Sequence, residues 1–195
     1  MPKAMRLSRF PLFSRLVFSG LLLVLLLNPA QATVMRYLEI EELARLSTLV
    51  FHGQVVSTKV FWDDSHTRIF TAVRVQVSET FKGAAQPGQL LTITQLGGQL
   101  DGLRLDYAGR PVFEVGEAVV LFTKPGRGGE LLVVGLKQGK LRVTGAEAVR
   151  DFAGITLMER PPTNKPGQAV ALGQSTRVQS RLSLGELRQR IANAR

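Results

Sequence analysis

The sequence predicts a mainly β protein, a small antiparallel OB-like barrel or sandwich with a short helix at each end, preceded by a signal peptide. Three observations support this prediction. Many segments between residues 49 and 152 are rich in Val, Leu and Phe, and the clearest alternates apolar and polar residues, as a strand with one buried face does. Gly and Pro residues separate these segments at short intervals. Apolar residues at helical spacing flank them on both sides.

The first 32 residues are expected to be a cleaved signal peptide. Basic residues precede an apolar run over 16–27, and Asn28-Pro29 ends that run. Ala30-Gln31-Ala32 then fits the small-x-small cleavage rule. The run is shorter than the roughly 20 residues that a membrane span needs. We therefore expect an exported protein, periplasmic or secreted, whose mature chain begins at Thr33.

Two further regions follow in the predicted organisation. Residues 33–155 are expected to form the OB-like β-barrel domain with its N-terminal helix, and residues 156–195 a Pro-containing loop with a short C-terminal helix. The first helix is predicted over 37–46, where acidic residues occupy the early turns, as the helix dipole favours. The expected strands cover 49–61, 68–81, 90–96, 103–107, 118–122, 131–136, 140–143 and 148–152.

Two of these segments have distinct patterns. Arg74, Gln76 and Ser78 alternate with Val73, Val75 and Val77, which indicates a strand with one wet face, whereas 118–122 is continuously apolar and indicates a strand buried on both faces.

The C-terminal region contains a long loop and a helix start. Residues 160–180 hold three Pro residues among small polar ones, which is typical of a loop or linker. Ser183 and Glu186 then form the capping-box pattern, and Leu184, Leu187 and Ile191 follow at helical spacing.

Composition excludes several classes of function. The chain has no Cys, which rules out thiol catalysis, Cys-ligated zinc and a bacterial lipid anchor. Its formal charge is +10, but the first 32 residues hold four of the 25 basic residues, so residues 33–195 carry +6. These cations are scattered, unlike those of a nucleic-acid groove. We expect no nucleic-acid partner, no membrane insertion after signal cleavage and no cofactor. An envelope or secreted protein is the expected partner.

The polar segment 61–68 is the most conspicuous candidate site. It combines Trp62, the only Trp, with Asp63, Asp64 and His66. A metal site, or a Ser/His/Asp triad with Ser65, can be written from these residues, but the calcium-loop, zinc and nucleophile-elbow patterns are missing. Asp and Ser side chains also bond their own backbone in turns. We therefore interpret the segment as a hairpin tip. With the Gly-rich loop that follows residue 96, it forms a candidate contact rim of Trp62, Asp63, Asp64, His66, Gln99 and Asp101.

Several strand-and-turn patterns resemble a known group of proteins. They are Ser47-Thr-Leu-Val-Phe-His-Gly-Gln-Val-Val56, Thr71-Ala-Val-Arg-Val-Gln-Val77, Thr80-Phe-Lys-Gly83, Val115-Gly-Glu-Ala-Val-Val-Leu-Phe122 and Gln138-Gly-Lys-Leu-Arg-Val143. This chain resembles uncharacterised exported bacterial proteins and, more distantly, the OB-fold netrin-like domain of tissue inhibitors of metalloproteinases. Those inhibitors chelate zinc through an N-terminal Cys that this chain lacks. The resemblance implies the fold, and the chelating mechanism does not carry over.

The sequence thus favours an exported, non-enzymatic binding or interaction module. One alternative is a protease inhibitor or protease-associated domain, which rests on the resemblance in fold. Another is a metal-dependent hydrolase that uses Asp63, Asp64 and His66.

Overall fold

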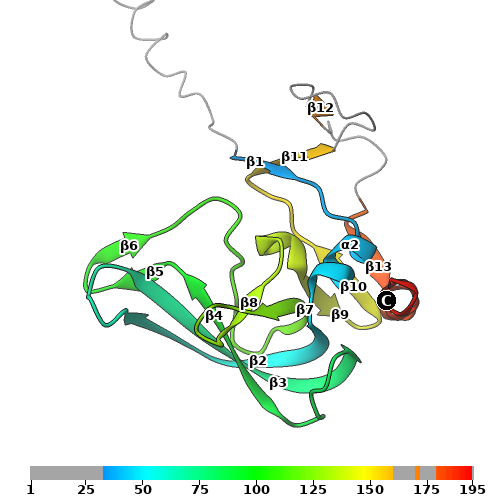
Figure 1. Cartoon of the computed structure of the whole chain (residues 1–195), viewed down its shortest axis with the longest axis horizontal. Coiled ribbons are helices and arrows are strands. Elements are labelled where there is room, and N and C mark those ends of the chain that lie inside the picture. The colour runs from blue at the N-terminus through cyan, green and yellow to red at the C-terminus, as the bar shows by residue number, and fades with distance from the viewer. Residues whose placement is uncertain (1–32, 160–169, 172–178, 195) are drawn as a thin grey trace, which may run out of the picture. The chain divides into compact units, whose positions relative to one another are not determined.

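The computed structural model describes residues 33–159, 170–171 and 179–194, and these residues form a mainly β fold with two α-helices (Figure 1). The helices are α2 (Ile40–Leu46) and α3 (Leu184–Asn193), and one 3-10 turn is η1 (Leu136–Gly139). The strands are β1 (Thr33–Arg36), β2 (Leu49–Trp62), β3 (Ile69–Lys82), β4 (Leu90–Leu96), β5 (Gly98–Leu100), β6 (Leu103–Leu105), β7 (Ala118–Pro125), β8 (Leu131–Val133), β9 (Lys140–Thr144), β10 (Glu147–Arg150), β11 (Ile155–Glu159), β12 (Val170–Ala171) and β13 (Arg181–Ser183).

Five strands form a closed ring in the order β2-β3-β4-β8-β7, because β7 pairs with both β2 and β8. The long strands β2 and β3 are antiparallel throughout, from Val50 opposite Lys82 to Trp62 opposite Ile69. β4 and β8 meet in parallel at a single pair, Ile93 and Leu131. The sequence predicted an antiparallel barrel or sandwich, and this one parallel pair departs from that description. It arises because β8 follows β7 by a hairpin, and that reversal leaves β8 running in the same direction as β4.

The two strand patterns singled out in the sequence are confirmed. In β3 the three Val side chains are buried and the intervening polar ones are exposed. In β7 every residue from Val119 to Thr123 is buried. β7 pairs with β2 on one edge, and with β9 and β8 in succession on the other. A strand paired on both edges and covered on both faces favours apolar side chains. The polar residue of this run, Thr123, donates its hydroxyl to the Leu49 carbonyl at 2.9 Å.

Two apolar clusters hold these elements together. One is formed by ring strands and includes Phe51, Val55, Val75, Ile93 and Leu121. The other is formed by the two helices with the opposite faces of β2, β7, β9 and β10, and includes Ile40, Leu43, Val50, Phe122, Leu141, Leu187 and Ile191. Neighbouring residues of β2 and β7 thus belong to different clusters, as the alternation of side chains along a strand requires.

Buried polar side chains fix the segment that precedes α2. Gln138 accepts a hydrogen bond of 2.9 Å from the Leu38 backbone N–H and donates one of 2.8 Å to the Arg36 carbonyl. Arg150 donates to the Leu38 carbonyl at 2.7 Å and to the Tyr37 hydroxyl at 3.2 Å. Buried backbone N–H and C=O groups outside a regular strand or helix need such hydrogen-bond partners.

The ends of the domain differ from the prediction. Residues 33–36 form a strand, β1, which pairs in parallel with β11, and α2 begins at Ile40 rather than Tyr37. The expected boundary at 155/156 falls inside β11. The Ser183 cap is confirmed, since its Oγ accepts from the Glu186 N–H at 3.1 Å. The signal peptide, and most of the loop expected over 160–180, lie outside the described residues.

Candidate functional site

Asp63 organises the turn between β2 and β3. Its Oδ1 accepts from the backbone N–H groups of Thr67 at 2.8 Å and Arg68 at 3.0 Å. Its Oδ2 accepts from the Ser65 hydroxyl at 3.0 Å and from Arg68 Nε at 3.2 Å. The Arg68 N–H, followed by the other donors, holds the pKa of Asp63 well below its usual range. The carboxylate therefore shapes the hairpin tip, as the sequence interpretation proposed.

Trp62 joins this turn to the β5–β6 hairpin. The indole Nε1 donates a hydrogen bond of 2.9 Å to Asp101 Oδ2, and the indole ring stacks on the His66 imidazole with centroids 6.3 Å apart. The structure therefore brings together four of the six predicted rim residues, Trp62, Asp63, His66 and Asp101. Asp64 and Gln99 are exposed on the same two segments.

The Gly97-Gly98 pair lets the β5–β6 hairpin fold back onto β2 and β3. A Cβ on Gly98 would lie 2.7 Å from Val60 Cγ1 and 2.9 Å from Thr71 Oγ1, and the φ of Gly98 is +151°. Thr71 Oγ1 also donates to the Gly97 carbonyl at 2.6 Å. The pair thus allows the hairpin backbone to lie close against the Val60 and Thr71 side chains.

The chemical alternatives find little support in this geometry. Ser65 bonds Asp63 and the Thr67 hydroxyl, whereas His66 stacks on Trp62. His52 pairs with Glu79, ten positions before Trp62 on β2, and so does not approach the turn. Within residues 33–159 and the described C-terminal segments, no group of three or more His, Asp or Glu side chains is arranged to hold a metal ion.

A pocket of about 570 Å³ lies next to the turn, and we call it the β4–β8 pocket. Most of its lining is apolar and comprises Phe70, Leu96, Tyr107, Pro111, Leu132, Val133 and Leu136. Its polar lining residues are Arg68, Thr94, Gln95, Arg127 and Glu130. This volume lies in the range that is usual for small-molecule sites. A mainly apolar wall with a few polar groups is also typical of such sites.

Gln95 is the unusual residue of this wall. It is only 7% exposed, and its Oε1 has no hydrogen-bond partner among the residues that the structure describes. A buried oxygen without a partner costs about 1–3 kcal/mol. Such atoms are rare in native proteins and call for an explanation.

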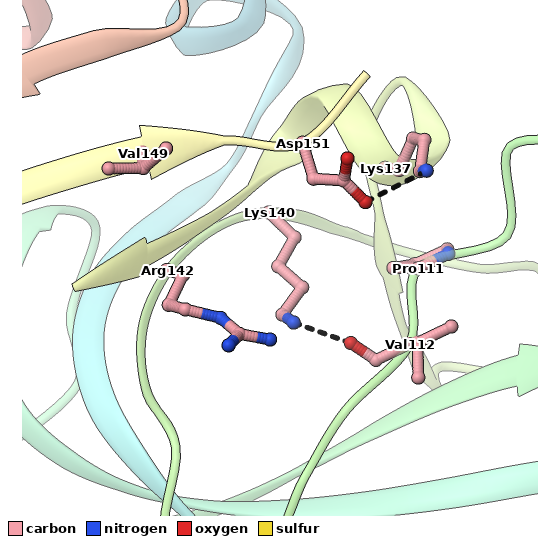
Figure 2. A pocket seen from close by; sticks show the side chains of 7 residues that line it. All are labelled: Pro111, Val112, Lys137, Lys140, Arg142, Val149 and Asp151. Carbon is pink, nitrogen blue, oxygen red and sulfur yellow. Dashed lines mark hydrogen bonds and ion pairs between the residues drawn. The ribbon is translucent and has the colours of Figure 1, made fainter. Parts of the chain in front are cut away.

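A second, smaller hollow of about 80 Å³ has a strongly charged lining (Figure 2). Its cations already have partners: Lys137 binds Asp151 at 3.0 Å, and Lys140 binds Glu117 at 2.7 Å and the Val112 carbonyl. Arg142 also binds Glu117, at 2.9 Å. The Lys140 and Arg142 contacts fasten the loop before β7 to β9, and the Lys137–Asp151 pair joins η1 to the segment after β10. We therefore assign this hollow a structural role.

Comparison with known proteins does not identify the site. No family model matches the chain, and no curated protein shows a significant match. Across the part of the chain that is described, no helix is long and apolar enough to cross a bilayer.

Sequence reasoning missed the pocket, although it found the turn beside it. Gln95 and Leu96 end a predicted strand, and Arg127 and Glu130 lie between the predicted strands 118–122 and 131–136. Their meeting depends on the parallel contact between β4 and β8, which has no signature in the sequence. The one available signal was Gln95 itself, a polar residue in phase with Leu91 and Ile93 on the inward face of its strand.

Proposed function

We propose that the chain is an exported, non-enzymatic binding module whose ligand occupies the β4–β8 pocket. The observation that carries this proposal is the composition of the pocket. It has a volume of about 570 Å³, and its mainly apolar wall contains a buried oxygen that has no partner among the described residues. Proteins place such walls where a ligand is held by apolar contact and oriented by a few polar groups.

The order of strands supports an OB-like barrel. The ring order β2-β3-β4-β8-β7, with β4 and β8 parallel, corresponds to strands one, two, three, five and four of a five-stranded barrel. In OB-folds the second and third strands, with the loops between strands one and two and between four and five, commonly bind ligands. Here those parts are β3, β4, the 63–68 turn and the 126–130 turn. The pocket is lined from all four of them, through Phe70, Gln95, Arg68 and Arg127.

The rim residues define one side of this site. Arg68 lines the pocket and is held by Asp63, while Trp62 ties the same turn to the β5–β6 hairpin. In this proposal the rim shapes the edge of the pocket and contributes contact surface. It does not supply a catalyst.

Binding of an apolar fluorescent probe tests the proposal. N-phenylnaphthylamine is titrated into residues 33–195, into Leu96→Trp, which places a bulky indole in the pocket wall, and into the control Leu103→Trp on exposed β6. We expect saturable binding to the wild type and the control, weakened at least about tenfold in Leu96→Trp by lost apolar burial. Equal binding to all three proteins, or none to any, would contradict the proposal.

A further inference from the structure

The charged side chains of the β4–β8 pocket carry both signs. Arg68 is neutralised by Asp63. Arg127 and Glu130 come from the same turn between β7 and β8, and neither makes an ion pair with another described residue. A lining with one neutralised cation, one further cation and one anion gives little net attraction for a strongly charged ligand.

The uncharged part of the lining says more about the chemistry of a ligand. Seven of the 12 lining residues offer apolar or aromatic surface, among them Phe70 and Tyr107. Gln95 stands in this wall with Oε1 unpartnered, while its neighbour in the ladder, Thr71, gives its hydroxyl hydrogen to the Gly97 carbonyl. Thr71 therefore has no proton left to offer Gln95.

The terminal amide of a Gln can rotate at little cost, because its last torsion is broad. Either the oxygen or the NH₂ group can then face a bound molecule. In the structure Oε1 has almost no exposed surface, so a ligand reaches it only after this rotation has turned the oxygen toward the pocket. A ligand that then brings an N–H or O–H group to Oε1 gives it a partner, and an equally apolar ligand without a donor leaves it without one. The amide thus gives the pocket a preference between two ligands of nearly the same shape.

We infer that the β4–β8 pocket selects a neutral, largely apolar small molecule that carries one hydrogen-bond donor, which Gln95 Oε1 accepts. This inference rests on the proposed function and adds the chemical class of the ligand. Gln95 acts in it as a specificity-determining residue.

A pair of probes tests the inference. N-phenylnaphthylamine has one N–H donor, and its N-methyl derivative has none. We measure the dissociation constants of both probes for the wild type, for Gln95→Leu and for the control Gln76→Leu, which makes the same change on the exposed face of β3. The ratio of the two constants within each protein cancels general effects of size and of folding.

We expect the wild type and Gln76→Leu to prefer the N–H probe by about fivefold, the effect of one net hydrogen bond. In Gln95→Leu the preference falls to the ratio set by the methyl group alone, while the N-methyl probe still binds. The melting temperature of Gln95→Leu stays the same or rises, since an unpartnered buried oxygen is removed.

Two other results overturn the inference in distinguishable ways. If both probes bind and Gln95→Leu leaves their ratio unchanged, the pocket binds ligands but Gln95 does not select them, as when trapped water satisfies Oε1. If neither probe binds, the proposed function fails together with the inference.

Discussion

Trp62 and Asp101 are joined by a hydrogen bond of 2.9 Å, although 39 positions separate them in the sequence. The bond connects the only indole of the chain to the tip of the β5–β6 hairpin. Asp101 and Gly102 form that tip and have positive φ, whereas Gly98, at the base of the hairpin, allows it to fold back. The hairpin is therefore held at both ends.

Trp62→Phe should loosen the tip of this hairpin and leave the ring intact. Phe keeps an aromatic ring at the end of β2 but has no donor for Asp101. A single exposed hydrogen bond contributes about 0.5–1.5 kcal/mol, so global stability should fall by no more than that. Amide hydrogen exchange should accelerate in residues 99–103 and stay unchanged in β7. Unchanged exchange at the hairpin tip would show that the bond is not needed there.

Asp63→Asn should weaken the fold at neutral pH and reduce its loss of stability in acid. The N–H groups of Arg68 and Thr67 lower the pKa of Asp63 in the folded state. A group whose pKa is lowered on folding stabilises the protein above its unfolded pKa, about 3.9, and that contribution is lost as the pH falls below it. Urea unfolding of both proteins between pH 7 and pH 2.5 measures the difference. Parallel curves would contradict the role of Asp63.

His52→Gln should reduce a second pH effect at milder acidity. Burial lowers the pKa of His52, and Arg188 lowers it further, against the opposing effect of Glu79. The unfolded chain therefore takes up a proton more readily, and the wild type should lose stability as the pH falls through about 6.5. Unfolding measured at pH 7.5 and 5.5 should show a smaller drop for His52→Gln. Glu79→Gln, which removes the opposing carboxylate, should make the drop larger.

Gly98→Ala should destabilise the protein more than Gly116→Ala. Both glycines have positive φ, but a Cβ on Gly98 meets Val60 and Thr71 within 3 Å, whereas a Cβ on Gly116 meets nothing within 4 Å. The control thus pays only the backbone cost of about 1–2 kcal/mol. We expect about 1–3 kcal/mol more for Gly98→Ala, by analogy with overpacked sites. Equal losses in thermal unfolding would show that the hairpin moves away freely.

Arg150→Lys should be costly although the charge is kept. The guanidinium lies over the rings of Tyr37 and Phe152, with its carbon 5.2 and 5.0 Å from their centroids. It also donates to the Tyr37 hydroxyl and the Leu38 carbonyl from separate nitrogens. A Lys cannot stack as a plane or serve both acceptors in this geometry. We expect a loss of about 1–3 kcal/mol in urea unfolding, and a loss below 0.5 kcal/mol would contradict this account.

The regular strands were predictable from the sequence because each carries its own signal. Residues 90–96 were predicted with the observed bounds, and β2 and β3 were predicted to within one residue at each end. Local alternation and Gly or Pro breaks suffice for such strands. The turn around Asp63 was equally accessible, because Asx side chains bond backbone groups only a few residues away.

The features that the sequence did not predict, β1 and the β4–β8 pocket, depend on pairing between distant segments. β1 is a strand because residues 155–158 provide its partner, and nothing in Val34, Met35 and Arg36 demands a strand on its own. The β4–β8 pocket likewise exists because two short strands meet at one residue pair and then diverge. Local patterns do not encode which distant segments become neighbours.

The parallel pairing of β1 with β11 also has a consequence for the order of assembly. β2 and β3 are neighbours in the sequence and can pair early in folding. β1 can pair only with residues that lie about 120 positions later in the chain. A chain synthesised from its N-terminus would carry residues 33–36 unpaired until most of the domain had been made. The first strand to appear would be among the last to find its place.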